Sequence, residues 1–437
     1  MRYSFRLAKL VGHTPDPRKR PGTIKQICEF SNLDRHQVAA LLKSEVKYIP
    51  LDAIGKLCDY LLAKRLAKPK DLPGILFALE PENFWELIAR RQWVEVCMGV
   101  RKEGTDDTLD DAWIVASDSV MFGELLRGIT DFRLWAPKAA ADAALLFPTP
   151  PPADGSENES GDNGDHGPTV IHHNGQEQAA AVATPLLPEV LRQTLVWSPG
   201  KNKPEYTTMA AKIHESFWNQ EEDDKALVCI GSVKSNPMVE RIIANVFGCP
   251  AFESQDTVAN SALRSVPFFL RYRDKDPRYL ESCCGGWQLA HGHAVEKPGI
   301  YFETKSGKWD CCPCDDKKQD AAFVFYVNRP SQGILEMALG GYSGRASRLL
   351  AQHLDRCAEQ FWPPVYHGQG LEVGAFVVRI HLKDKARKDK SNFGHDDAPK
   401  IEVQRLDEEV IARRMQAVSE AQGEETEERP VGEEVAD

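Results

Sequence analysis

The sequence predicts a multi-domain protein with an all-α head and an α/β body. Apolar residues recur at helical spacing through residues 1–80, whereas strand-like and helix-like runs alternate through residues 186–385. The length of 437 residues allows two to four domains at roughly 100–200 residues each. We expect the body to be Rossmann-like, with a partly parallel sheet.

Charge is distributed unevenly along the chain. Residues 1–70 contain 15 Lys or Arg and 6 Asp or Glu, a net charge of +9, while the whole chain carries −11. A basic head on an acidic body indicates an anionic partner for the head, and double-stranded DNA is the first candidate. No run of about 18 apolar residues is present, so we expect no transmembrane helix.

Three short helices are predicted within residues 23–62. The first carries Ile24 and Ile27 on one face, and Asp34 is suited to cap the second. Pro50 stands where the third begins. A tight turn between the first two helices makes this a helix-turn-helix.

The same residues resemble the Cro/CI-like (XRE-type) family of DNA-binding domains. The resemblance rests on the pattern IKQIC-x4-L-x4-VAALLK-x6-P-x3-I-x2-LC-x2-L and covers about residues 5–80. It implies that the second helix enters the major groove, with base-edge contacts from Arg35, His36 and Gln37. It also implies phosphate contacts from Lys25, Lys43 and Lys47, together with residues 18–20. The basic, Pro-rich segment 13–22 departs from the family pattern and is either an arm or a loop.

Composition marks the remaining boundaries. Residues 148–185 begin with a Pro-, Gly- and acid-rich run and are predicted to be a disordered linker. Residues 386–437 are predicted to be a charged acidic tail. The short segment 84–147 has strand and helix signals, and is either a separate α/β domain or the first part of the body's sheet.

Two glycine-rich turns in the body each follow a buried strand and precede a helix. Such turns point backbone N–H groups at a bound anion. The candidate ligand-binding residues are Gly231, Ser232, Lys234 and Asn236 in the first turn, and Gly341, Ser343, Gly344 and Arg345 in the second. We expect both turns to lie at one edge of the sheet and to form a single pocket for an anionic, nucleotide-like ligand. The alternative is that both are ordinary strand-to-helix connections, with Asn236 as a helix cap.

Other chemistry-bearing residues give weaker signals. Five cysteines and two histidines within residues 283–314 lack zinc-site spacing, so we expect no bound metal, and no cofactor is expected either. Asp118 follows a strand and is interpreted as a helix cap. No catalytic set of base, nucleophile and orienting group emerges.

These features predict a cytoplasmic, homodimeric transcriptional regulator with a DNA-binding head and a ligand-sensing body. One alternative is a nucleotide-processing enzyme or defence effector that carries a DNA-binding module. Another is a scaffold whose body only oligomerises.

Overall fold

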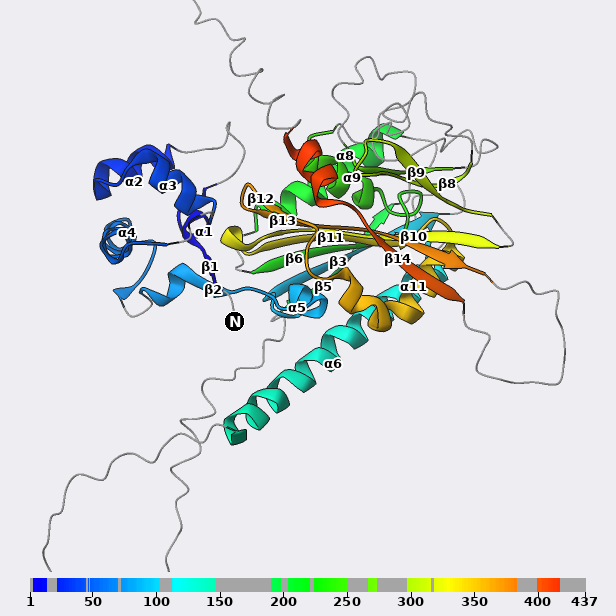
Figure 1. Ribbon diagram of the computed structural model, residues 1–437, viewed down its shortest axis with the longest axis horizontal. Helices are drawn as coiled ribbons and strands as arrows, with labels where there is room; N and C mark the ends of the chain where they lie inside the picture. The colour runs from blue at the N-terminus through cyan, green and yellow to red at the C-terminus, as the bar shows by residue number, and fades with distance from the viewer. Residues whose placement is uncertain are drawn as a thin grey trace, which may run out of the picture.

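The computed structural model divides into a head and a body, each with its own hydrophobic core (Figure 1). It describes residues 3–13, 22–44, 46, 48–69, 72–102, 112–146, 190–197, 203–220, 224–249, 266–272, 297–315, 318–382 and 399–416. The predicted linker 148–185 lies outside these ranges.

The head consists of short helices closed by a pair of strands. Strand β1 pairs antiparallel with β2, so that Tyr3 lies opposite Leu79. The prediction of an all-α head is therefore wrong, because pairing between residues so distant in sequence leaves no local signal. The elements are β1 (Tyr3–Phe5), α1 (Leu7–Leu10), α2 (Thr23–Ser31), α3 (Arg35–Leu42), α4 (Leu51–Ala63), a 3-10 turn (Gly74–Leu76) and β2 (Phe77–Leu79).

A nine-stranded mixed sheet forms the centre of the body. Its parallel part runs β5 (Val190–Trp197), β3 (Trp93–Lys102), β6 (Lys225–Ile230) and β11 (Ile334–Gly341). Antiparallel strands continue it as β10 (Gln319–Arg329), β13 (Leu371–His381) and β14 (Lys400–Arg405). The short strands β12 (Tyr366–Gly368) and β4 (Ala112–Ile114) pair with β13 and β3.

This strand order revises two boundaries drawn from the sequence. Because β3 lies between β5 and β6, the segment 84–147 contributes to the same sheet as residues 186–385. Strand β14 and a helix over residues 408–416 pack on the body, so residues 400–416 belong to the body rather than to a tail. The alternating apolar residues of β14, Ile401 and Val403, pack against the body's core.

Helices cover both faces of the sheet (Figure 1). Helices α8 (Lys203–Trp218) and α9 (Pro237–Val246) lie on one face. Helices α5 (Phe84–Ala89), α6 (Ala116–Leu146) and α11 (Gly344–Cys357) lie on the other. A 3-10 turn (Ala358–Phe361) follows α11, and another (Pro330–Gln332) joins β10 to β11. A separate three-stranded sheet consists of β7 (Phe268–Arg271), β8 (Gly299–Glu303) and β9 (Trp309–Pro313).

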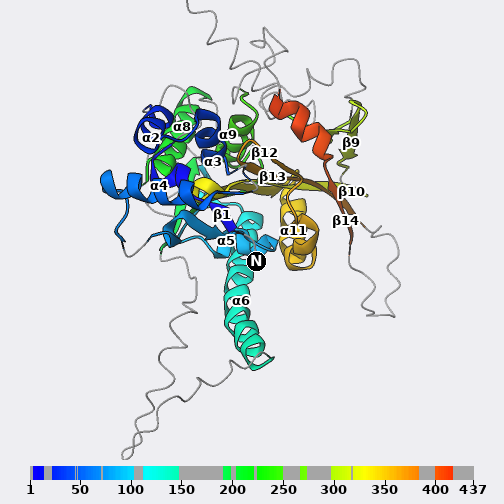
Figure 2. The same ribbon diagram turned by 60° about the vertical axis from the view of Figure 1, so that its left-hand side comes forward.

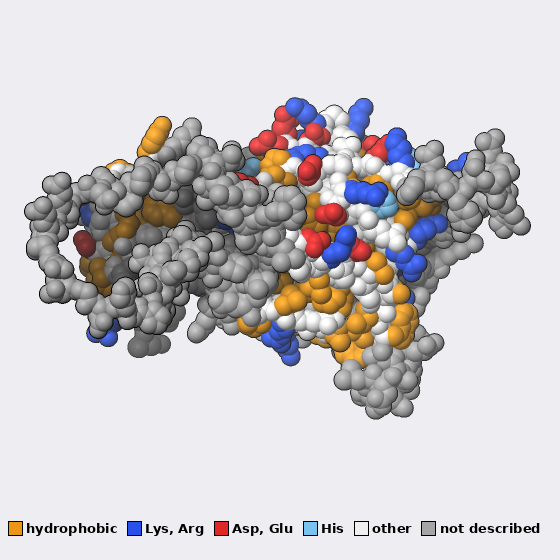
Figure 3. Space-filling view, turned by 90° about the horizontal axis from the view of Figure 1, so that it is seen from below, with side chains coloured by type: hydrophobic (Ala, Val, Ile, Leu, Met, Phe, Trp, Pro, Cys, Tyr) orange, Lys and Arg blue, Asp and Glu red, His pale blue; other side chains and the backbone are white. Residues whose placement is uncertain are grey.

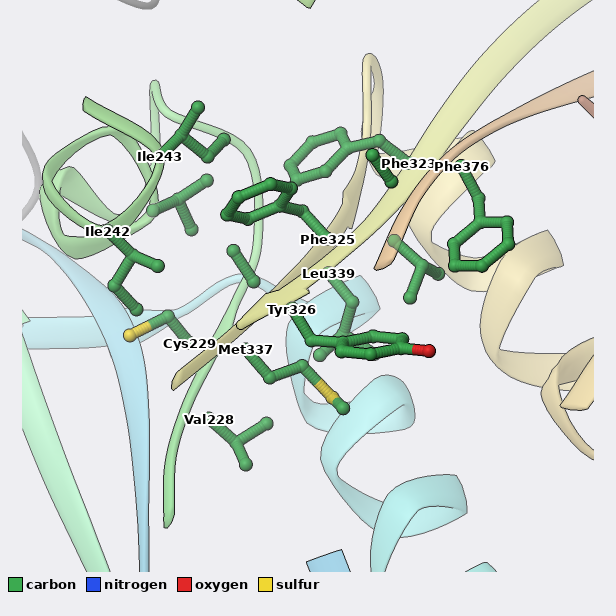
Figure 4. Close-up of a cluster of buried hydrophobic side chains, with 14 of the residues drawn as sticks. Val228, Cys229, Ile242, Ile243, Phe323, Phe325, Tyr326, Met337, Leu339 and Phe376 are labelled. Atoms are coloured by element: carbon green, nitrogen blue, oxygen red, sulfur yellow. The ribbon is translucent and has the colours of Figure 1, made fainter. Parts of the chain in front are cut away.

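Burial on both faces explains the nearly continuous apolar sequence of the central strands. Every residue of β6 and β11 is buried, as expected of strands that are covered on two sides. Figure 4 shows Phe323 and Phe325 of β10 on the side of α9, and Tyr326 and Met337 on the side of α6. This alternation is the period-2 pattern of a strand.

The head rests directly on the body. Arg6, between β1 and α1, forms a salt bridge with Asp224, and its Nη1 lies 3.0 Å from Asp224 Oδ2. Gln332 donates a hydrogen bond to the carbonyl oxygen of His13 at 3.4 Å. Since Asp224 immediately precedes β6, the head meets the sheet at the amino ends of its parallel strands. The view in Figure 2 has the head turned toward the reader.

The structure bears on the membrane expectation only within the described ranges. There, none of the helices combines the length and apolarity that crossing a bilayer requires.

Candidate functional site

The carboxyl ends of β3, β6 and β11 approach one another too closely for side chains. The Gly231 N–H donates to the carbonyl of Leu339 at 3.0 Å. A Cβ on Gly340 would lie 2.1 Å from the Gly231 carbonyl oxygen, and one on Gly99 would lie 1.6 Å from that of Ser235. The glycines here are required by backbone contact.

The chain leaves these strands in opposite directions. Strand β6 leads into α9 on one face of the sheet, and the neighbouring β11 leads into α11 on the other (Figure 1). In open α/β sheets this topological switch point is where ligands bind. The two glycine-rich turns therefore lie side by side at one edge, as the shared-pocket hypothesis requires.

Asp118 lies at this edge, in the first turn of α6. Its side chain is 2% exposed. Oδ1 accepts a hydrogen bond from the Ser117 hydroxyl at 3.2 Å. Burial raises the pKa of Asp118, and hydrogen bonding to the Ser117 and Ser235 hydroxyls partly opposes this rise. A buried carboxyl group with a raised pKa is typical of functional sites.

An aromatic pair adjoins the first turn. The Lys234 ammonium lies 4.1 Å from the centre of the Tyr272 ring, a cation–π contact. The Tyr272 ring lies 5.2 Å from that of Tyr342, which directly follows β11. Lys234 and Tyr342 therefore connect the two turns through Tyr272.

Asn236 caps helix α9. Its Nδ2 donates to the carbonyls of Cys97 at 2.9 Å and Ile230 at 3.0 Å. Its Oδ1 accepts from the Met238 N–H at 3.0 Å, which caps α9. With the side chain fully buried, these bonds satisfy the amide and leave it nothing to offer a ligand.

Ser343 and Arg345 meet an acid that the sequence pattern did not indicate. Ser343 Oγ donates to Asp320 Oδ2 at 2.5 Å and caps α11 by accepting from the Ala346 N–H. Arg345 Nη2 lies 3.1 Å from the same Oδ2. Asp320 is 1% exposed, so it offsets the charge of Arg345 and weakens this turn as an anion site.

The other candidate ligand-binding residues of the two turns contact neighbouring protein groups. The Ser232 N–H donates to the Ser235 hydroxyl at 3.1 Å. A Cβ on Gly341 would lie 2.2 Å from the Ser347 nitrogen, and one on Gly344 would lie 3.3 Å from the Ser117 hydroxyl. Helix α11 therefore packs closely on the strand ends, and Ser117 and Asp118 lie beside both turns.

A second buried charge cluster lies toward the amino end of β11. Glu336, fully buried, lies 2.5 Å from both His214 Nε2 and Arg329 Nη1. Burial alone raises the pKa of Glu336, but Arg329 and His214 lower it to about 2. Both carboxylate oxygens are paired, so this cluster fixes α8 on the sheet.

Three of the candidate DNA-binding residues, Arg35, His36 and Gln37, begin α3, while Lys25 lies in the first turn of α2 and Lys43 follows the end of α3. Arg35 and His36 are exposed and Gln37 is half-buried. Lys25 and Lys43 are exposed, and Lys25 Nζ lies 3.8 Å from Glu29. Lys47 and residues 18–20 lie outside the described ranges.

The cysteine cluster is described only in part. Burial raises the pKa values of Cys312 and Cys314, and that of Cys311 to about 12. Cys283, Cys284, His291 and His293 lie outside the described ranges. Within those ranges no group of three or more His, Cys, Asp or Glu side chains is placed to hold a metal ion, and the absence of zinc stays a prediction.

Comparison with known proteins identifies no relative: no protein-family model, curated protein or solved structure matches the chain. The functional interpretation therefore rests on the geometry above and on the sequence.

We predict that Gly231→Ala destabilises the fold. Gly231 has φ +116°, and a Cβ there would lie 2.5 Å from Ser235 Oγ and 2.8 Å from Asp118 Oδ2. Backbone strain and crowding together should cost more than about 2 kcal/mol in urea unfolding. Gly307→Ala is the control, because its φ of +77° is strained too but nothing lies within 4 Å. Equal losses for the two variants would contradict crowding at the strand ends.

We predict that Asp118 makes stability depend on pH. Its folded-state pKa is raised above the ordinary value of 3.8, so its contribution is fully present below that value. The contribution is lost as the pH rises through the folded-state pKa. Relative to Asp118→Asn, the wild type should therefore lose free energy of unfolding as the pH rises above 3.8, measured by urea titration. Asp310→Asn, at an exposed acid, is the control, and parallel curves for wild type and Asp118→Asn would contradict the prediction.

Proposed function

We propose that this protein is a sequence-specific DNA-binding regulator whose body binds an anionic, nucleotide-like ligand. The observation that carries the proposal is the α2–α3 hairpin of the head, with the start of α3 exposed on a domain of net positive charge. That arrangement is the one a helix-turn-helix uses in the major groove.

The turn between α2 and α3 is sharp and locally encoded. Asn32 has φ 54° and ends α2, with its N–H donating to the Cys28 carbonyl at 2.9 Å. Asp34 caps α3 by accepting from the backbone N–H groups of His36 at 2.8 Å and Gln37 at 3.3 Å. The cap fixes the amino end of α3, and this supports Arg35, His36 and Gln37 as the reading residues of the proposal.

The ligand part of the proposal rests on the switch point between β6 and β11. Glycine-rich strand ends there accept close approach by a ligand, and the Lys234 ammonium supplies positive charge. The buried carboxyl group of Asp118 adds a hydrogen-bond acceptor suited to a sugar hydroxyl. A nucleotide combines both chemistries.

The contact that holds the head on the body and the proposed ligand site lie at opposite ends of β6. Asp224, which binds Arg6 of the head, precedes the strand, and Gly231 follows it. A ligand that shifts β6 would therefore change the Arg6–Asp224 contact that holds the head. The expected coupling free energy between ligand binding and DNA binding is about 1–3 kcal/mol. Because the head docks directly on the body, a change at β6 can reach the head without passing through the linker.

One observation favours the enzymatic alternative. Asp118 is a buried acid with a raised pKa beside the Ser117 hydroxyl, an environment in which carboxyl groups serve as general acids or bases. Nucleotide turnover by the purified protein would favour this alternative over a sensor.

We predict distinct effects for two head variants on DNA binding by the full chain. On a duplex selected from a random library, Arg35→Ala should lose about 1–3 kcal/mol and discriminate less at one base pair. Lys43→Ala should weaken all duplexes about equally, because it would contact phosphate. Fluorescence anisotropy across salt concentrations measures both, with the exposed Lys64→Ala on α4 as control. Absence of salt-dependent binding to any duplex would end the DNA-binding proposal.

We predict that nucleotides stabilise the full chain against heat and that Lys234→Ala removes this effect. A nucleotide at about 100 times its Kd should add about 2.7 kcal/mol. Thermal unfolding with inorganic phosphate and with nucleoside mono-, di- and triphosphates measures it. Lys308→Ala, exposed between β8 and β9, should keep the full shift. An unchanged shift in Lys234→Ala would remove this residue from the site, and no shift with any nucleotide would overturn the ligand class.

A further inference from the structure

Strand β5 forms one edge of the nine-stranded sheet. Within the described ranges it pairs only with β3, in the register Trp93↔Val190 to Val100↔Trp197. The Val190 N–H donates to the Gln92 carbonyl at 3.1 Å. Because backbone direction alternates along a strand, the N–H and C=O groups of Leu191, Gln193 and Leu195 point to the open edge.

This edge lacks the features that prevent strands from pairing with other chains. Leu191 and Leu195 are 46% and 51% exposed, and Val190 is 39% exposed. The strand contains one charged residue, Arg192, and no proline. Natural edge strands are usually short or charged. Strand β14, at the other side of the sheet, follows this rule with Lys400, Glu402 and Arg405. Seen from below, the surface of the body carries hydrophobic and charged side chains next to each other (Figure 3).

The sequence of β5 is complementary to itself about its centre. In an antiparallel pair with a two-fold axis at Gln193, Leu191 lies opposite Leu195 and Val190 lies opposite Val196. Gln193 then lies opposite itself, and its amide can bond to its copy. The outward-pointing residues Leu191, Gln193 and Leu195 are the ones that such a pair joins by backbone hydrogen bonds. Moving the axis by one residue, to Arg192 or to Thr194, would place a leucine opposite Gln193.

We propose that β5 pairs antiparallel with β5 of a second copy of this chain, about a two-fold axis at Gln193. This isologous contact buries the exposed leucines, satisfies the open backbone edge and joins the two sheets into one. The pairing is independent of whether the head binds DNA, so its failure and that of the proposed function are separable.

Site-specific cross-linking of the full chain tests the register. Gln193→Cys should form an intermolecular disulfide with its own copy under a mild added oxidant, since directly opposite Cα atoms are about 5.5 Å apart. Leu191→Cys should not, because its copy lies about four residues away, roughly 13 Å. Mixing Leu191→Cys with Leu195→Cys should restore the cross-link. Leu51→Cys, at a residue that is 83% exposed on the head, is the control for random collisions. The wild type is the control for cross-links through the native cysteines.

Sedimentation equilibrium of the unmodified chain is the second measurement. We expect a dimer, and Gln193→Pro, which removes a backbone donor at the axis, should shift it to monomer. A monomeric wild type, or a dimer in which Gln193→Cys cross-links no faster than Leu51→Cys, would overturn the proposal. The second outcome would place the dimer contact on another surface.

Discussion

Strand β6 is the element on which the rest of the molecule depends. It is enclosed between β3 and β11, and all of its residues are buried, so its backbone groups must be satisfied by those neighbours. Asp224 at its start binds Arg6 of the head and accepts hydrogen bonds from the N–H groups of Gln92 and Trp93. Gly231 at its end bonds to β11 and packs beside Asp118. One strand therefore positions both the contact with the head and the candidate site.

The sequence predicted element types well where periodicity is strong. The apolar runs of β6 and β11 and the helices α9 and α11 lie where the pattern indicated. Strand pairing was not predictable to the same extent, because β1, β2 and β14 are short and gain their stability from partners far along the chain. Membership of β3 in the main sheet depends on contacts across the segment 148–185, which no local pattern records.

The candidate site was predictable as a place but not as a set of side chains. Both glycine-rich turns lie at the same edge, since parallel strands must end together. Which side chains are available was decided by partners from elsewhere: Asp320 holds Arg345, and the carbonyls of Cys97 and Ile230 hold Asn236. Asp118 was underestimated because an acid at a helix start usually caps it, and its burial against Gly231 is a tertiary effect.

The position of residues 148–185 divides the chain in sequence but not in space. The head, β3 and α6 precede this segment, whereas β5, β6 and every later strand follow it. A cut there would separate two polypeptides of unlike content: one with the basic head and a strand from the middle of the sheet, the other with the strands on both sides of it. The backbone ladders from β3 to β5 and β6, together with the Arg6–Asp224 pair, would still hold them together. The molecule is therefore built as two complementing halves, and neither half can complete the sheet alone.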